Sequence, residues 1–167
     1  MPETAGRRPG LYVTREIITK AVCGVGDKCF QYARVLRLPE DQSLSRILGT
    51  AITRVTLPEP REMILPTSDD LSVPVGGSFD INVWYSYNDR MDTAVLKDRV
   101  TVSELLPMTM SSPPAGNEVK ARLALTQHPE CTFVDPHGDG AVRVGVRFEL
   151  RAEVIAETKV AVQVAPD

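Results

Sequence analysis

The residues best suited to catalysis or metal binding gather in one stretch, in which His128 and Cys131 are followed by His137. Imidazole and thiolate groups are common zinc ligands, and a Cys–His pair can also form an activated nucleophile. A structural zinc site needs four ligands, commonly in close pairs, whereas these three are spread over a loop, a strand and a turn. We therefore expect no metal ion here and interpret the stretch as a hairpin whose turn is Asp135 to Gly140.

Two further stretches match binding motifs only in part. The residues from Asp135 begin like a calcium-binding loop, but Val146 stands at the twelfth position, where a bidentate Glu is required. The stretch from Gly24 to Cys29 lacks the third glycine and the following helix of a dinucleotide or phosphate loop. No Gly-x-Ser-x-Gly motif is present. We therefore predict no catalytic residue, no cofactor and no enzyme activity.

The composition restricts the class of protein. A chain of 167 residues with 43% hydrophobic and 25% charged residues is typical of a globular domain that needs neither metal nor disulfide. A net charge of −3 gives no support to nucleic-acid binding. No apolar run approaches the roughly 20 residues of a membrane helix, and the N-terminus lacks the apolar part of a secretory signal. We expect a protein made in a cytoplasm, without membrane insertion, whose cysteines begin as thiols.

The elements that would position these residues are predicted to be strands, because apolar and polar residues alternate with a period of two. The alternation is clearest from Ala141 to Val154. A continuous strand of that span would be about 45 Å long, so we expect it to bend, to carry a bulge or to cross between sheets. One side of it is apolar and the other charged: Val142, Val144, Val146, Phe148, Leu150, Ala152 and Val154 against Arg143, Arg147, Glu149, Arg151 and Glu153.

The remaining chain follows the same pattern in shorter segments. We predict an all-β fold in a single domain, an antiparallel two-sheet sandwich or flattened barrel. Residues 1–14 are predicted to be a flexible leader and residues 15–167 the β domain. The predicted strands are Arg15–Val22, Ile52–Leu57, Ser78–Asn88, Thr93–Val102 and Val119–Leu125; the predicted loops are Pro58–Pro74 and Ser111–Asn117; Ser103–Met110 is a weak helix candidate, and Ala156–Thr158 a turn.

Trp84 stands on the polar side of its predicted strand. Phe79, Ile81, Val83 and the two tyrosines form the apolar row, so Trp84 points away from it. Two explanations stay open: both faces of this strand are covered inside the sandwich, or Trp84 lies on an outward face that another chain covers. Our candidates for a self-assembly seam are Trp84, Tyr85 and Tyr87.

Several segments, in this order, resemble spore coat protein E, the outer spore coat morphogenetic protein family of endospore-forming Bacillota. They are REIITKAV, DINVWYSYN with TAVLKDRV, HPEC, and LRAEVIAETKVAVQVAPD. The resemblance runs from about Arg15 to Asp167, and is poor between Leu36 and Val75. Familiar members continue into a long acidic tail, which we expect to be absent here.

The resemblance implies a non-enzymatic scaffold, made in the mother-cell cytoplasm and then located in the spore coat around the forespore. It implies self-association, attachment to the basement-layer coat-assembly ATPase, and recruitment of outer coat proteins. We expect a homo-oligomer that extends into a lattice or fibre through its sheet edges. Cys23 and Cys29 are candidates for thiols that cross-link chains. The alternative is a non-enzymatic binding module of the spore envelope that recognises a glycan or a peptide.

Overall fold

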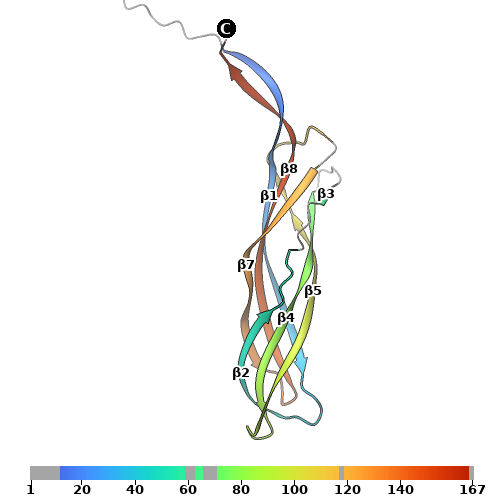
Figure 1. Cartoon of the computed structure of the whole chain (residues 1–167), viewed down its shortest axis with the longest axis vertical. Coiled ribbons are helices and arrows are strands. Elements are labelled where there is room, and N and C mark those ends of the chain that lie inside the picture. The colour runs from blue at the N-terminus through green and yellow to red at the C-terminus, as the bar shows by residue number, and fades with distance from the viewer. Residues whose placement is uncertain (1–11, 59–62, 66–70, 117–118, 166–167) are drawn as a thin grey trace, which may run out of the picture.

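The computed structural model describes residues 12–58, 63–65, 71–116 and 119–165, and all their regular secondary structure is β (Figure 1). None of these segments forms a helix long and apolar enough to cross a membrane. The strands are β1 (Val13–Arg37), β2 (Leu44–Thr53), β3 (Met63–Leu65), β4 (Ser72–Tyr87), β5 (Asp92–Pro107), β6 (Thr109–Met110), β7 (Val119–Pro136) and β8 (Ala141–Val164).

The strands form two antiparallel sheets that pack face to face. One sheet has the order β3-β7-β8-β1-β6 and the other the order β2-β4-β5. The sheets are separate, so the two-sheet sandwich is confirmed and the flattened barrel is not formed. The body of the molecule is long and narrow, because its main strands run nearly along one axis (Figure 1).

The core lies between the sheets and is built by alternation along each strand. On β8 the row from Val142 to Val154 is fully buried, as the sequence predicts, while the charged row faces outward. Phe148 stacks on Phe30 with ring centroids 5.3 Å apart, and on Tyr32 at 5.8 Å. Phe79, from the opposite sheet, meets Phe148 edge to face at 6.0 Å. This aromatic cluster joins the two sheets.

Several predicted elements differ in the structure. Of the predicted strand Ile52–Leu57 only Ile52 and Thr53 are in a strand, at the end of β2. In the predicted loop Pro58–Pro74, Met63–Leu65 form β3, and residues 59–62 and 66–70 lie outside the described part. Ala156–Thr158 is not a turn, because β8 continues to Val164 and pairs with β1 over its whole length. Ser103–Met110 is not helical; it is the end of β5 followed by the short strand β6. Strand β4 begins at Ser72, earlier than expected, and includes Pro74. Pro74 is tolerated because β2 pairs with β4 only as far as Asp80, so this end of β4 lies at a sheet edge.

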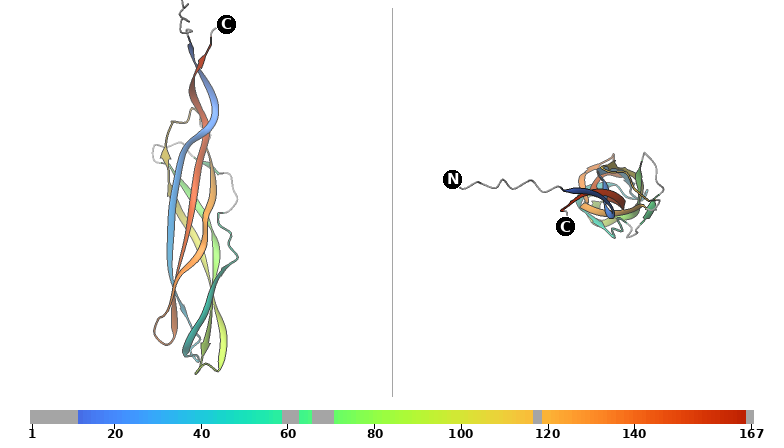
Figure 2. Two further views of the ribbon diagram at one scale, coloured as in Figure 1. Left: turned by 90° about the vertical axis from the view of Figure 1, so that its left-hand side faces the viewer. Right: turned by 90° about the horizontal axis from the view of Figure 1, so that it is seen from above.

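A long two-stranded arm extends beyond the sandwich. It consists of Val13–Lys20 of β1 paired with Glu157–Val164 of β8, past Ala156, the last residue of β8 that pairs with β7, and we call this ribbon the arm. Figure 2 shows that the body ends well below its tip. The predicted leader, residues 1–14, overlaps the arm: Val13 and Thr14 belong to β1, whereas residues 1–11 lie outside the described part.

A β-bulge at Cys23 lies close to the base of the arm. Val22 pairs with Ile155 and Gly24 with Val154, so β1 carries one extra residue there. From the bulge toward Arg37, the even-numbered residues of β1, such as Phe30, lie on the side of the core. Above it the odd-numbered residues, such as Ile17, lie on that side, because one extra residue exchanges the two faces of a strand.

Candidate functional site: exposed apolar surfaces

The stretch with His128 and Cys131 lies in the bulged part of β7. The pairing of β7 with β8 shifts between Gln127 and Glu130, which leaves His128 and Pro129 without partners in the ladder. His128 and His137 are exposed, and the Cys131 thiol donates to the carbonyl of Phe133 at 3.2 Å. The described residues contain no group of three or more His, Cys, Asp or Glu side chains placed to hold a metal ion. The stretch bends a strand and leads into the predicted turn.

Gly24 and Gly26 allow another segment of the chain to pack closely against β1. A Cβ atom on Gly26 would lie 2.4 Å from the carbonyl oxygen of Pro107, and one on Gly24 would lie 2.5 Å from the sulfur of Met110. The missing side chains let the segment from Pro107 to Met110 lie directly on β1, where it pairs as β6. The sequence could not show this, because the two segments are distant along the chain.

The two candidate cross-linking cysteines have opposite environments. Cys23 is fully buried and its thiol donates to the carbonyl of Val154 at 3.6 Å; burial raises its pKa. Cys29 is exposed beside the ion pair between Arg147 and Glu149, whose nitrogen and oxygen atoms are 2.8 Å apart. In the folded chain only Cys29 of the two is accessible to a second molecule.

The three aromatic candidates on β4 are split between its two faces. Tyr85 is 1% exposed and belongs to the core, and Tyr87 is partly buried with its ring 5.8 Å from that of Tyr85. Trp84 is 44% exposed on the outer face. The idea that Trp84 is enclosed within the sandwich is therefore wrong. Of the three, only Trp84 lies on the outer face, where another chain can contact it.

The surroundings of Trp84 form an apolar surface on the outer face of the smaller sheet. Trp84 lies opposite Gly49 on β2 and Val95 on β5. Nothing lies within 4 Å of the place where a Cβ on Gly49 would stand, so there is open space over the residue paired with Trp84. Leu48 and Val95 are 53% and 39% exposed. We call Leu48, Gly49, Trp84 and Val95 the Trp84 surface.

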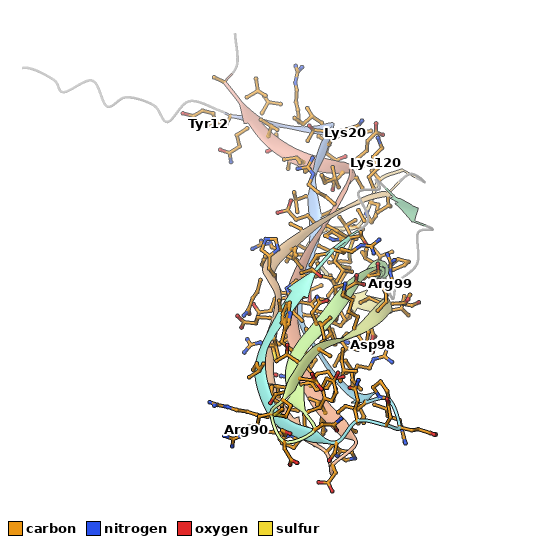
Figure 3. The ribbon with its side chains drawn as sticks, turned by 60° about the horizontal axis from the view of Figure 1, so that its bottom comes forward. Tyr12, Lys20, Arg90, Asp98, Arg99 and Lys120 are labelled. Atoms are coloured by element: carbon orange, nitrogen blue, oxygen red, sulfur yellow. The ribbon has the colours of Figure 1, made fainter. Side chains whose placement is uncertain are left out.

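The Trp84 surface lies in the half of the body farther from the arm. Strand β4 runs on from Trp84 to the turn at Asn88, Asp89 and Arg90, all three with positive φ angles. The turn is fastened to the start of β2 by Asn88, whose amide donates to the carbonyl of Ser43 at 3.1 Å. Figure 3 shows Arg90 at one end of the molecule and Tyr12, which precedes the first residue of the arm, at the other.

The arm carries the second group of exposed apolar side chains. Val13, Ile17 and Ile18 on β1 are 49%, 46% and 62% exposed, and Val160 and Val164 on β8 are 38% and 40% exposed. Sequence reasoning found the strand from Arg15 to Val22 but not its isolation, because alternation does not tell whether a second layer covers a strand. Exposed aliphatic side chains in such numbers are typical of protein–protein contact.

A comparison with protein families identifies the family of this chain. A family model described as Outer spore coat protein E (CotE) matches residues 13–167, from the first residue of β1 onward. The chain belongs to this family. No curated protein matches the chain, and no solved structure does. Membership in the outer spore coat protein E family implies a structural protein of the outer spore coat, and hence a location in that coat.

Proposed function

We propose that this member of the outer spore coat protein E family is a self-assembling morphogenetic scaffold unit, which organises the outer coat by binding copies of itself and recruiting other coat proteins. The observation that carries the proposal is the presence of two separate exposed apolar surfaces, the arm and the Trp84 surface, the latter in the half of the sandwich farther from the arm. A unit with two separated contact surfaces can extend into a chain or lattice, whereas a unit with one closes into a dimer.

Sheet edges support the same function. Strand β1 pairs with β6 only at Gly24 and Val25, so within the described part of the chain most of its outer edge has no strand hydrogen-bonded to it. An unpaired edge presents backbone donors and acceptors on which another chain can add a strand. In the proposed scaffold this edge is where further coat proteins, or the basement-layer ATPase, would attach. Self-association would start in the mother-cell cytoplasm and continue on the forespore.

The test compares the parent with Trp84→Ala and with Leu105→Ala. Leu105 lies on β5, in the same sheet as Trp84, and is 59% exposed, so it controls for the loss of any exposed apolar group. We expect the parent to form large particles in light scattering and negative-stain microscopy, Trp84→Ala to form smaller ones, and Leu105→Ala to resemble the parent. A parent that stays monomeric at every concentration and salt tried would refute the scaffold function.

The Trp84 surface also suits the alternative of glycan or peptide binding, because an exposed indole can stack on a sugar ring. The same variants separate the two functions. Glycan-array binding by a monomeric parent, lost in Trp84→Ala, would favour the binding module over the scaffold.

A further inference from the structure

The inner row of β8 is covered in the body and bare on the arm. Alternate residues from Val142 to Thr158 are buried beneath the second sheet and neighbouring loops. The row continues without a register break on β8, yet Val160 and Val164 are 38% and 40% exposed. The apolar pattern therefore extends beyond the part of the chain that can cover it.

The partner strand supplies matching residues on the same side. Val13 pairs with Val164, Arg15 with Val162, and Ile17 with Val160. We call these six residues the arm face. Arg15 is its one charged residue, and its alkyl stem can lie along apolar neighbours while the guanidinium reaches water.

The opposite side of the arm has the composition of a solvated surface. Among the described residues it carries Glu16 and Glu157 with Lys20 and Lys159, and Lys20 pairs directly with Glu157. The apolar residues on this side are Ile18, which pairs with Lys159 and is 62% exposed, Ala161 and, toward the body, Val22 with Ile155; Val22 is 46% exposed. The balance of charges on this side, against a row of aliphatic residues on the other, distinguishes the arm face as the side to be covered.

We infer that the arm face packs against the arm face of a second copy of this chain, with the two arms antiparallel; this deepens the proposed scaffold function and rests on it. A two-stranded ribbon is only marginally stable in water, whereas two ribbons stacked about 10 Å apart make a two-layer sandwich. The second arm has the length, width and aliphatic row needed to cover the first. The arrangement repeats in the arm the two-layer packing that covers the same row of β8 in the body.

The antiparallel direction follows from the shape of the molecule. The body is thicker than the arm, so parallel arms in contact would bring the two bodies against each other (Figure 2). Antiparallel arms place the bodies at opposite ends of the joined pair. An arm of eight residue pairs is about 26 Å long, and two strands of that length offer less than the roughly 800 Å² per partner of a stable dimer. The contact is weak by itself and gains strength where other surfaces also join the copies.

The test uses two neighbouring isoleucines on opposite sides of the arm. Ile17→Lys places a charge on the arm face, and Ile18→Lys makes the same change on the solvated side, where the exposed fraction is larger. We expect sedimentation of Ile17→Lys to show self-association weakened on the order of 100-fold, because a buried charge is costly. Ile18→Lys should match the parent, and circular dichroism should show all three chains equally folded.

Cross-linking identifies what covers the arm. In a background with Cys29→Ser and Cys131→Ser, Ile17→Cys is treated with a bis-maleimide whose spacer is about 10 Å, the distance between stacked sheets. A covalent dimer for Ile17→Cys, and none for Ile18→Cys, is the expected result. Weaker association of Ile17→Lys without that dimer would mean that the arm docks elsewhere on its neighbour, and would overturn the arm-to-arm contact. Equal behaviour of the two lysine variants, with a parent that assembles, would overturn it while leaving the scaffold function intact. A parent that never associates would overturn both.

Discussion

Replacing Phe148 with alanine removes the ring through which the two sheets meet. Phe148 is fully buried, stacks on Phe30 and Tyr32, and meets Phe79 of the other sheet at 6.0 Å between centroids. A buried Phe→Ala change costs about 3–5 kcal/mol through lost transfer energy and the cavity that remains. Each aromatic pair contributes about 0.5–1.5 kcal/mol, and part of this is lost as well. We therefore expect a loss of about 4–5 kcal/mol, a large share of the roughly 5–15 kcal/mol that stabilises a domain.

The measurement is urea unfolding followed by far-ultraviolet circular dichroism, at a concentration where parent and variant have the same mass. With a slope near 2 kcal/mol per molar urea, the midpoint of Phe148→Ala should fall by about 2 M. The matched control is Phe133→Ala, which makes the same chemical change at a side chain that is 37% exposed beside Gly145. Its expected loss is about 1 kcal/mol. Equal midpoints for the two variants would show that the aromatic cluster does not join the sheets as described.

Two further predictions concern a hydrogen bond between the sheets and a close approach of two strands. The Tyr32 hydroxyl donates to Glu104 at 2.9 Å, and burial, followed by this bond and the Glu104 charge, raises the pKa of Tyr32 above its ordinary value of 10. The folded state therefore holds the phenol proton more tightly than the unfolded state, and this stability is complete below pH 10 and lost as the pH rises further. Tyr32→Phe should lower the free energy of unfolding by about 1–2 kcal/mol at neutral pH. Above pH 10 the urea midpoint of Tyr32→Phe should decline less than that of the parent. An equal decline would contradict the role given to the Tyr32 proton. Gly26→Ala should lower the free energy of unfolding by about 1–3 kcal/mol, because the added Cβ meets the backbone oxygen of Pro107. The control Gly49→Ala, with open space around it, should change the urea midpoint little. Similar midpoints for the two variants would show that β6 does not depend on Gly26.

Local alternation was sufficient to predict the fold class and most of the core. The row on β8 from Val142 to Val154 was predicted correctly, because burial on one face leaves a clear period of two in the sequence. The same pattern misplaced the end of that strand: Ala156–Thr158 resembled a turn, but Thr158 is still buried and β8 continues. What holds this segment in the strand is its pairing with β1, which is a long-range contact.

The candidate surfaces were predicted less completely, for physical reasons. The outward direction of Trp84 follows from alternation, but whether a second layer covers it depends on sheet order, which the sequence alone does not contain. Tyr85 and Trp84, adjacent in sequence, cannot share one seam because neighbouring strand residues face opposite ways. The arm face was missed because the bulge at Cys23 exchanges the faces of β1, and a one-residue shift leaves no mark in composition.

The arm is made of the beginning of β1 and the end of β8, so the described chain enters and leaves the molecule at one place (Figure 1). A fluorescent protein or affinity tag joined directly to Val13 or to Val164 would therefore be held at the arm tip. The turn between β7 and β8 lies at the opposite end, where the amide of Leu44 donates to the carbonyl of Asp139 at 2.9 Å. Inserting a label in that turn keeps the bulk of the label away from both strands of the ribbon.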